Sequence, residues 1–439
     1  MQIQIIGGKP ISGSIYINAA KNAVLPILAA SLLIDGTIIL HDIPKITDID
    51  NMLLILSRMG CHIARKGLTL KIHVRQTLDN LNVSGEIFSK LRGSILISGA
   101  IFAKTGKLFF QKSGGCSIGA RPIDIHISSF KQIHKKNIFL DFPSVGATEN
   151  LIIASVIGHK THIIHNAAKE PEVADLCDFL NACGAKIDGI GTSILTIQGV
   201  KTLHGTEYTP IPDRITTGSY MLALIAAGGD ITLQNVVPEH NANLIAKLKL
   251  IGAKIKIHPH KPPVHLQRTQ NSAPRISHSA ISISYKKLLH RRPRRINIHT
   301  APYEGFPTDL QSQFAAAAAT INGTTTITEN LFENRFHYVT ELKKLGAKIM
   351  QTDGKTITIK GVKSLAASVT PSACPDEIHT VCSGLSLTAN DLRGGVALVI
   401  AALGANGTTT IINADYIYRG HADIVKDLFG VGANIISIN

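Results

Sequence analysis

A cysteine in a glycine-rich segment is the first residue of this chain that could do chemistry. The segment reads Gly114-Gly-Cys116-Ser-Ile-Gly-Ala-Arg121. A nearby cation lowers the pKa of a thiol, and a glycine-rich backbone leaves the sulfur accessible. The pattern therefore indicates a reactive thiol at Cys116. A structural cysteine beside a turn is the alternative that these residues alone leave open.

Charged residues also stand where further helices are expected to begin. Lys21 and Asn22 open one helix, and Arg92 opens another. The free N–H groups of a helix start, together with a cation, favour an anion. Asp309, within Phe306–Gln311, either caps the helix that follows or faces a cleft as a base. These segments predict an anion site close to a carboxylate.

A repeat along the chain supplies the elements that must position these residues. Glycine opens an Ile/Thr-rich strand six times, at Gly36, Gly106, Gly158, Gly229, Gly323 and Gly407. A second glycine closes an amphipathic helix five times, at Gly60, Gly184, Gly252, Gly346 and Gly432. Glycine suits the left-handed residue just past a helix end. The spacing predicts six βαβ-type units of about 70 residues each.

Six units divide naturally into two α/β domains of three units. We expect the first domain to span residues 21–213 and the second to combine residues 1–20 and 214–439, with the N-terminal strand returning to it. The second unit is short and lacks its closing glycine, and inserts near 260–293 and 366–388 lengthen two later units. A cleft between two such domains is a natural ligand site.

Composition limits the partners and the compartment. Much of the formal charge of +15 lies in residues 254–295, where Tyr285 is the only Phe, Trp or Tyr. This favours a solvated excursion over a nucleic-acid patch. No apolar run reaches the roughly 18 residues of a membrane helix and no secretory leader is expected, so scattered cysteines predict a reducing, cytoplasmic location. Cys374, His379 and Cys382 lack a fourth ligand, and no metal is expected.

The string from Gly114 to His126 resembles the signature of the UDP-N-acetylglucosamine 1-carboxyvinyltransferase family, part of the EPSP synthase superfamily. Seven further motifs stand in the order of that family, namely Lys21–Ala23, Ser144–Asn150, Asn166–Glu172, Pro212–Arg214, Phe306–Gln311, Phe332–Phe336 and Asp391–Arg393. The resemblance covers the chain apart from the two inserts. It implies two inside-out α/β barrels of three units each, which close over phosphoenolpyruvate and UDP-N-acetylglucosamine.

The same resemblance implies a role for each candidate residue. Cys116 resembles the proton donor to the enol methylene carbon, and Asp309 the base for the sugar 3-hydroxyl, with Lys21 and Arg419 completing the catalytic set. The residues implied to bind phosphoenolpyruvate are Lys21, Asn22, Arg121, Arg393 and Arg419. Those implied to bind the UDP-sugar are Arg92, Arg121, Pro122, Ile123, Asp124, Ile125, Ser144, Val145, Gly146, Asp309 and Leu331. No cofactor is implied, because the phosphate of phosphoenolpyruvate is the leaving group.

The shortened second unit departs from the family pattern, because members use the missing residues for a helix end and two strands. Three other functions therefore stay open. A degenerate homologue would bind the UDP-sugar without turnover, and a sibling enzyme would use shikimate 3-phosphate. A basic scaffold would bind nucleic acid through residues 254–295. On the main interpretation the two small-molecule substrates are the partners, with neither nucleic acid nor membrane, and the oligomeric state is not specified.

Overall fold

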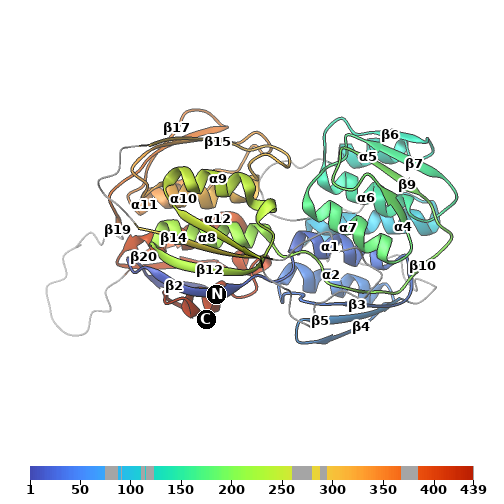
Figure 1. Ribbon diagram of the computed structural model, residues 1–439, viewed down its shortest axis with the longest axis horizontal. Helices are drawn as coiled ribbons and strands as arrows, with labels where there is room; N and C mark the ends of the chain where they lie inside the picture. The colour runs from blue at the N-terminus through green and yellow to red at the C-terminus, as the bar shows by residue number, and fades with distance from the viewer. Residues whose placement is uncertain are drawn as a thin grey trace.

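Two α/β domains lie side by side in the computed structural model of the protein, and both chain ends belong to one of them (Figure 1). The structure describes residues 1–74, 88–89, 91–109, 114, 123–259, 279–286, 294–366 and 384–438. Among these residues, no helix is both long enough and apolar enough to cross a membrane.

Three four-stranded sheets build the domain that carries both termini. Their strand orders are β13-β14-β12-β2, β15-β16-β18-β17 and β20-β22-β1-β23. In each sheet a parallel pair at one edge is followed by two antiparallel pairs. The N-terminal strand β1 lies in the third sheet between β22 and β23.

The strands of this domain are β1 (Gln2–Ile6), β2 (Ile11–Tyr16), β12 (Gly229–Val236), β13 (Lys254–Pro259), β14 (Ser279–Tyr285), β15 (Arg294–His299), β16 (Gly323–Thr328), β17 (Lys348–Gln351), β18 (Thr356–Lys360), β20 (Leu385–Thr388), β22 (Thr408–Ile412) and β23 (Asn434–Ile438). A short pair, β19 (Leu365–Ala366) and β21 (Ala405–Asn406), forms a separate two-stranded sheet.

Three central helices of this domain are α8 (Arg214–Ala227), α10 (Gln311–Ala318) and α12 (Leu392–Gly404). They contact one another and are almost entirely buried, as expected of helices that are apolar on all sides. The other helices are α9 (Ala242–Ile251), α11 (Tyr338–Lys344) and α13 (Ile424–Gly430), with short 3-10 turns η2 (Pro238–Asn241), η4 (Thr308–Leu310) and η5 (Ala414–Arg419).

The first domain repeats the same sheet pattern twice among its described residues. Its sheets have the orders β10-β3-β5-β4, with β11 also on β3, and β6-β7-β9-β8. The strands are β3 (Ile34–Leu40), β4 (His62–Lys66), β5 (Thr69–Val74), β6 (Asn137–Phe139), β7 (Thr161–His165), β8 (Lys186–Asp188), β9 (Ile194–Gln198), β10 (Leu203–His204) and β11 (Glu207–Tyr208). The helices are α1 (Lys21–Ser31), α2 (Thr47–Arg58), η1 (Arg92–Leu96), α4 (Ile97–Thr105), α5 (Asp124–Lys131), α6 (Val145–Ser155) and α7 (Pro171–Ala182).

The glycine pattern of the repeat is confirmed at the helix ends. All five closing glycines have positive φ, from 83° at Gly346 to 100° at Gly252. One of the six predicted strand starts is wrong. Gly106, with φ of 69°, ends α4, and the described residues that follow it, 107–109, are not a strand. A left-handed glycine is a common way to end a helix, and that role does not require a strand to follow.

The two predicted inserts, near 260–293 and 366–388, are wrong in part, because both contain residues of strands. Ser279–Tyr285 is the strand β14, which pairs with β12 on one side and β13 on the other, with Ile281 and Ile283 buried. Leu385–Thr388 is the strand β20, and Ala366 belongs to β19. The alternation of Ile and Ser in β14 is the period of a half-buried strand, which the surrounding basic residues obscured. Residues 260–278, 287–293 and 367–383 lie outside the described residues.

The chain passes between the domains twice, and the two passages run side by side. The N–H of Ala20 donates to the carbonyl of Ile211 at 2.7 Å, and the N–H of Asp213 donates to the carbonyl of Asn18 at 2.9 Å. Helices α1 and α8 start directly after these contacts. The charged residues that begin them are therefore held next to the boundary between the domains.

Candidate active site

A cleft of about 540 Å³ is lined by residues of both domains. The predicted site residues that line it are Lys21, Asn22, Arg92, Ile125, Ser144, Val145, Gly146, Asp309, Leu331, Arg393 and Arg419. They come from α1, η1, α5 and α6 of the first domain and from η4, α12 and η5 of the second, with Leu331 after β16. Segments almost 400 residues apart in the chain thus meet at one cavity.

Five predicted residues are not among the lining residues. Ile123 and Asp124 lie at the start of α5, beside Ile125 but outside the described lining of the cleft. Cys116, Arg121 and Pro122 lie outside the described residues. The reactive thiol and the arginine that follows it therefore stay predictions.

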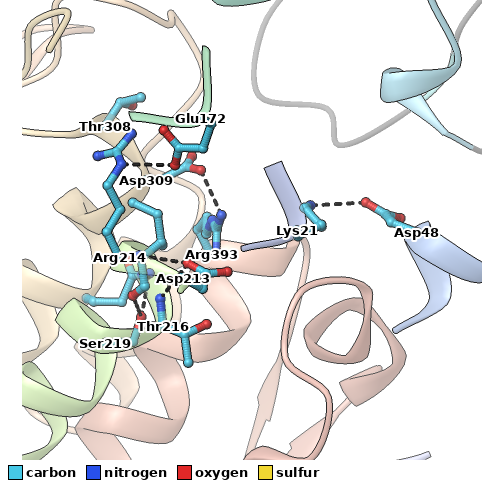
Figure 2. A network of polar contacts seen from close by, with 12 residues as sticks. Lys21, Asp48, Glu172, Asp213, Arg214, Thr216, Ser219, Thr308, Asp309 and Arg393 are labelled. Atoms are coloured by element: carbon cyan, nitrogen blue, oxygen red, sulfur yellow. Dashed lines mark hydrogen bonds and ion pairs between the residues drawn. The ribbon is translucent and has the colours of Figure 1, made fainter. Parts of the chain in front are cut away.

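Asp309 lies in the turn η4, where two arginines hold its carboxylate. Nη2 of Arg335 donates to Oδ1 at 2.6 Å, and Nη2 of Arg393 donates to Oδ2 at 2.7 Å (Figure 2 shows Asp309 and Arg393). Burial acts to raise the pKa of Asp309, but Arg393, Arg335 and Lys21 together hold it well below its usual range. In this geometry Asp309 is a firmly ionised carboxylate and not the cap of a helix.

Asp48 holds two cations on the opposite side of the cleft. Its Oδ2 accepts a hydrogen bond from Nζ of Lys21 at 3.1 Å, and its Oδ1 accepts one from Nε of Arg419 at 3.0 Å. Figure 2 shows the Lys21–Asp48 pair separated from Asp309 and Arg393. The cleft therefore contains two carboxylates, each shared between two cations.

A histidine at the first-domain wall of the cleft is kept neutral. Nδ1 of His126 accepts a hydrogen bond from the side-chain amide of Asn150 at 3.0 Å. Burial, with Arg92 as a second cause, lowers the pKa of His126 to about 4.

The start of α6 belongs to the same wall of the cleft. Ser144 caps this helix by accepting from the N–H of Ala147 at 3.4 Å, and Ser144, Val145 and Gly146 line the cavity. This wall combines helix-start N–H groups with Arg92 and suits an anionic ligand.

A buried acidic cluster joins the domains beside the cleft. Glu172 accepts from Nε of Arg214 at 2.9 Å, and Glu170 accepts from the backbone N–H of Tyr303 at 3.2 Å. Burial raises the pKa of Glu149 well above its usual range, and the negative charges of Glu172 and Glu170 raise it further. This part of the cleft lining therefore carries a carboxyl, that of Glu149, which holds a proton more readily than usual, whereas Asp309 is ionised.

The sequence interpretation did not assign roles to Arg335, Asp48 or the acidic cluster. Arg335 stands in the Phe332–Phe336 motif, which gave a usable signal. Asp48 gave none, because an acidic residue in the first turn of a helix is explained by the helix dipole alone. Among the described residues, no group of three His, Cys, Asp or Glu side chains is arranged to bind a metal ion.

Two α/β domains with a repeated sheet pattern and a cationic cleft between them define the class of enolpyruvyl transferases of the EPSP synthase fold. The sequence matches the EPSP synthase (3-phosphoshikimate 1-carboxyvinyltransferase) family over residues 5–136 and 132–428. The solved structure of the enolpyruvyl transferase NikO from Streptomyces tendae superposes with a TM-score of 0.77, at 20% identity over 99% of this chain and 98% of its own. EPSP synthase from Acinetobacter baumannii superposes with a TM-score of 0.68, at 16% identity over 99% of each chain.

Relatives with higher sequence identity indicate which family within this class the chain belongs to. UDP-N-acetylglucosamine 1-carboxyvinyltransferase 2 of Caldanaerobacter subterraneus subsp. tengcongensis is 38% identical over 456 aligned residues, covering 100% of this chain and 99% of the relative. UDP-N-acetylglucosamine 1-carboxyvinyltransferase of Halothermothrix orenii is 38% identical over 449 residues, covering 98% of both. The chain belongs to the UDP-N-acetylglucosamine 1-carboxyvinyltransferase family.

Proposed function

We propose that this chain transfers the enolpyruvyl group of phosphoenolpyruvate to the 3-hydroxyl of UDP-N-acetylglucosamine and releases phosphate, the first committed step of peptidoglycan synthesis. The observation that carries the proposal is the cleft itself. Lys21 and Arg419 meet there across the domain boundary, opposite the carboxylate of Asp309. The near-full-length similarity to enzymes named for this reaction supports the same substrates here.

Phosphoenolpyruvate binds, on this proposal, at the cations that converge on the cleft. Lys21, Asn22, Arg393 and Arg419 line the cavity. Arg121, which lies outside the described residues, is proposed to bind the same substrate. A guanidinium presents a planar fork of N–H donors that matches phosphate and carboxylate oxygens. Phosphoenolpyruvate carries both groups, so several cations are needed to offset its charge.

The UDP-sugar binds along the first-domain wall, with Asp309 and Leu331 closing the site from the second domain. Ser144, Val145 and Gly146 offer the start of α6, and Arg92 adds a cation to the same wall. Ile123, Asp124 and Ile125 continue the site at the start of α5, together with Arg121 and Pro122. This arrangement directs the diphosphate to cationic and N–H donors.

Asp309 acts as the base in this mechanism, and its present contacts limit its basicity. A carboxylate that accepts from two arginines holds a proton weakly. The anionic groups of phosphoenolpyruvate compete for Arg393, and the loss of this donor raises the pKa of Asp309 toward that of a useful base. The proton of the sugar 3-hydroxyl then passes to Asp309 as the sugar oxygen forms a bond to C2 of phosphoenolpyruvate.

Cys116 acts as the acid that protonates C3 of phosphoenolpyruvate in the same addition. The product is a tetrahedral ketal, in which C2 carries both the sugar oxygen and the phosphate. Phosphate then leaves C2 as the Cys116 thiolate takes a proton back from C3, which restores the double bond as an enol ether. The proton held by Asp309 leaves with the phosphate, so both groups return to their starting states. Lys21 and Arg419 stabilise the departing phosphate, so the reaction needs no cofactor.

The details of the fold follow the same proposal. Each domain is an inside-out barrel of three units, with residues 21–213 in the first and residues 1–20 and 214–439 in the second. The recurrence of one strand pattern in five sheets supports the units. The described residues of the second unit, from Gly106 to the next opening at Gly158, contain α5, β6 and α6, and β6 lies in the sheet of the following unit. A shortened second unit stays part of this proposal.

A cytoplasmic location is part of the proposal. The described cysteines, Cys61, Cys177 and Cys183, are all free and buried, as a reducing compartment would allow. The two substrates are the partners that the proposal requires, and it leaves the oligomeric state open.

Phosphate release by the purified protein tests the reaction. We expect release with phosphoenolpyruvate and UDP-N-acetylglucosamine, none with phosphoenolpyruvate and shikimate 3-phosphate, and loss of release in Cys116→Ala. Release that occurs with phosphoenolpyruvate and shikimate 3-phosphate, but not with phosphoenolpyruvate and UDP-N-acetylglucosamine, would favour the sibling reaction. A folded protein that binds the UDP-sugar but releases nothing would be a degenerate homologue.

Alkylation by the epoxide fosfomycin tests Cys116 separately. Burial raises the pKa of Cys61 to about 11 and that of Cys183 to about 12, so these thiols serve as internal controls. Mass spectrometry should place the adduct on Cys116 and leave the other two unmodified. A Cys116→Asp variant should form no adduct.

A further inference from the structure

Asp48 touches cations that approach it from two sides of the domain boundary. It lies in the first turn of α2 in the first domain and is 3% exposed. Lys21 begins α1 directly after the chain enters this domain, whereas Arg419 ends η5 in the second domain. The side chains of Lys21 and Arg419 are only 12% and 16% exposed. All three groups line the cleft.

The backbone next to these contacts also joins the two domains. The hydroxyl of Thr47 donates to the carbonyl of Tyr418 at 3.5 Å, so the start of α2 lies against the end of η5. The residues that follow, Asp48 and Arg419, then form their ion pair at 3.0 Å. The position of Arg419 relative to Lys21 therefore depends on how the two domains are placed.

A carboxylate at this point solves an electrostatic problem. Two cations brought close together in a partly buried cleft repel one another, and an anion between them offsets that repulsion. The bond from Nε also orients the plane of the Arg419 guanidinium. Asp50 provides the contrast within α2, because it is exposed and pairs with Nη1 of Arg65 at 3.1 Å. Both acids lie in the first turn of α2, but only Asp48 reaches the cleft lining.

We propose that Asp48 is a positioning residue that aligns Lys21 and Arg419 into one anion site and makes this site depend on closure of the two domains. The inference rests on the proposed function, which supplies phosphoenolpyruvate as the anion. The wall assigned to the UDP-sugar, at Arg92 and Ser144, is built from other residues of the same cleft. Loss of the Asp48 carboxylate should therefore weaken the binding of phosphoenolpyruvate far more than the binding of the UDP-sugar.

Steady-state kinetics of Asp48→Asn, with Asp50→Asn as the matched control, tests the proposal. Both variants remove one charge from the first turn of the same helix. Asp48→Asn should lower kcat/KM for phosphoenolpyruvate by about 30-fold or more, because a buried charge pair loses one partner. The KM for UDP-N-acetylglucosamine should stay within about two-fold, and Asp50→Asn should leave all constants within about two-fold. Equal effects of the two variants, or an equal rise in both KM values for Asp48→Asn, would overturn the proposal.

Asp48→Glu separates charge from packing, with thermal unfolding of each variant recorded alongside. It retains the carboxylate and should recover part of the lost kcat/KM. The same loss in Asp48→Glu and Asp48→Asn, at wild-type thermal stability, would mean that the charge is not responsible and would overturn the proposal. If Asp48→Asn does not fold, Asp48→Glu decides alone, since a selective change in KM for phosphoenolpyruvate supports the proposal and wild-type constants overturn it.

The proposed function can fail separately. If the wild-type protein releases no phosphate, titration calorimetry with inorganic phosphate replaces the kinetics. Binding that is weakened by Asp48→Asn and not by Asp50→Asn then supports the role of Asp48. Binding that is the same in both variants overturns it.

Discussion

The two carboxylates that bridge cations in the cleft differ in where their partners come from. Asp309, Arg335 and Arg393 all belong to the second domain, whereas Asp48 joins Lys21 of the first domain to Arg419 of the second. The Asp309 contacts are shorter, at 2.6 and 2.7 Å, than the Asp48 contacts, at 3.1 and 3.0 Å. One site is assembled when a single domain folds, and the other is complete only when both domains are in place.

The two carboxylates also differ in the exposure of their side chains, and the one with the shorter contacts is the more exposed. The side chain of Asp309 is 27% exposed, and that of Asp48 is 4% exposed. A carboxylate that keeps some access to the cleft can exchange its arginines for a substrate and then take a proton. A buried one retains its cations and shapes the site around them. This difference is consistent with the roles proposed above, proton transfer for Asp309 and alignment of cations for Asp48.

Removal of the Asp309 charge should have the largest effect on turnover. Asp309→Asn keeps the shape of the side chain but cannot act as a base, so kcat should fall by roughly 10²- to 10⁴-fold. Binding of UDP-N-acetylglucosamine, followed by calorimetry, should persist. A kcat within ten-fold of wild type would show that another group takes the proton and would remove the distinction between the two carboxylates.

A third carboxylate at the boundary extends the comparison to stability. Asp42 accepts from the side-chain amides of Asn18 at 2.7 Å and Asn235 at 3.3 Å, and no Lys or Arg donates to it within the described ranges. Burial raises its pKa to about 6 from an ordinary 3.8. Because the folded protein holds this proton more tightly, the stabilisation is complete below pH 3.8 and is lost as pH rises through about 6.

Asp42→Asn should therefore flatten the dependence of stability on pH between about 4 and 6. The difference at stake is at most about 3 kcal/mol in the free energy of unfolding. Urea unfolding of wild type and variant at several pH values measures it. An unchanged slope would show that Asp42 titrates normally and that amide donors do not make this carboxylate different from Asp48 or Asp309.

Loss of one of the two arginines that donate to Asp309 should change kcat less than loss of the Asp309 carboxylate, and it tests whether these arginines set the pKa of Asp309. Arg335→Met removes the donor to Oδ1 and one of the cations that lower the pKa of Asp309. The pKa should rise, so the acid limb of the kcat profile should move to higher pH, and kcat at neutral pH should change by about 10-fold or less. A limb at the wild-type position would show that Arg335 does not control this proton.

Much of the fold could be predicted because its signals are local. A closing glycine such as Gly252 is needed wherever the backbone turns left-handed, and that requirement is independent of distant residues. The apolar period of α9 and the start of α1 at Lys21 are equally local. The expected strand after Gly106 is wrong because a glycine that ends a helix does not by itself require a strand to follow. The strand β14 was missed because basic neighbours outweighed its alternation.

The sequence by itself predicted Lys21, Asp309, Arg393 and Arg419 as site residues through its motifs, and it determined the closing glycines of the helices and the family. It could not determine which cations share a carboxylate. Asp48 and Arg419 are separated by 371 residues, and Asp309 and Arg393 by 84. Local backbone preferences act over a few residues, whereas an ion pair depends on where two separately folded segments meet in space. Only the tertiary structure therefore decided that the two arginines paired with Asp309 come from its own domain, whereas the cations paired with Asp48 come from two domains.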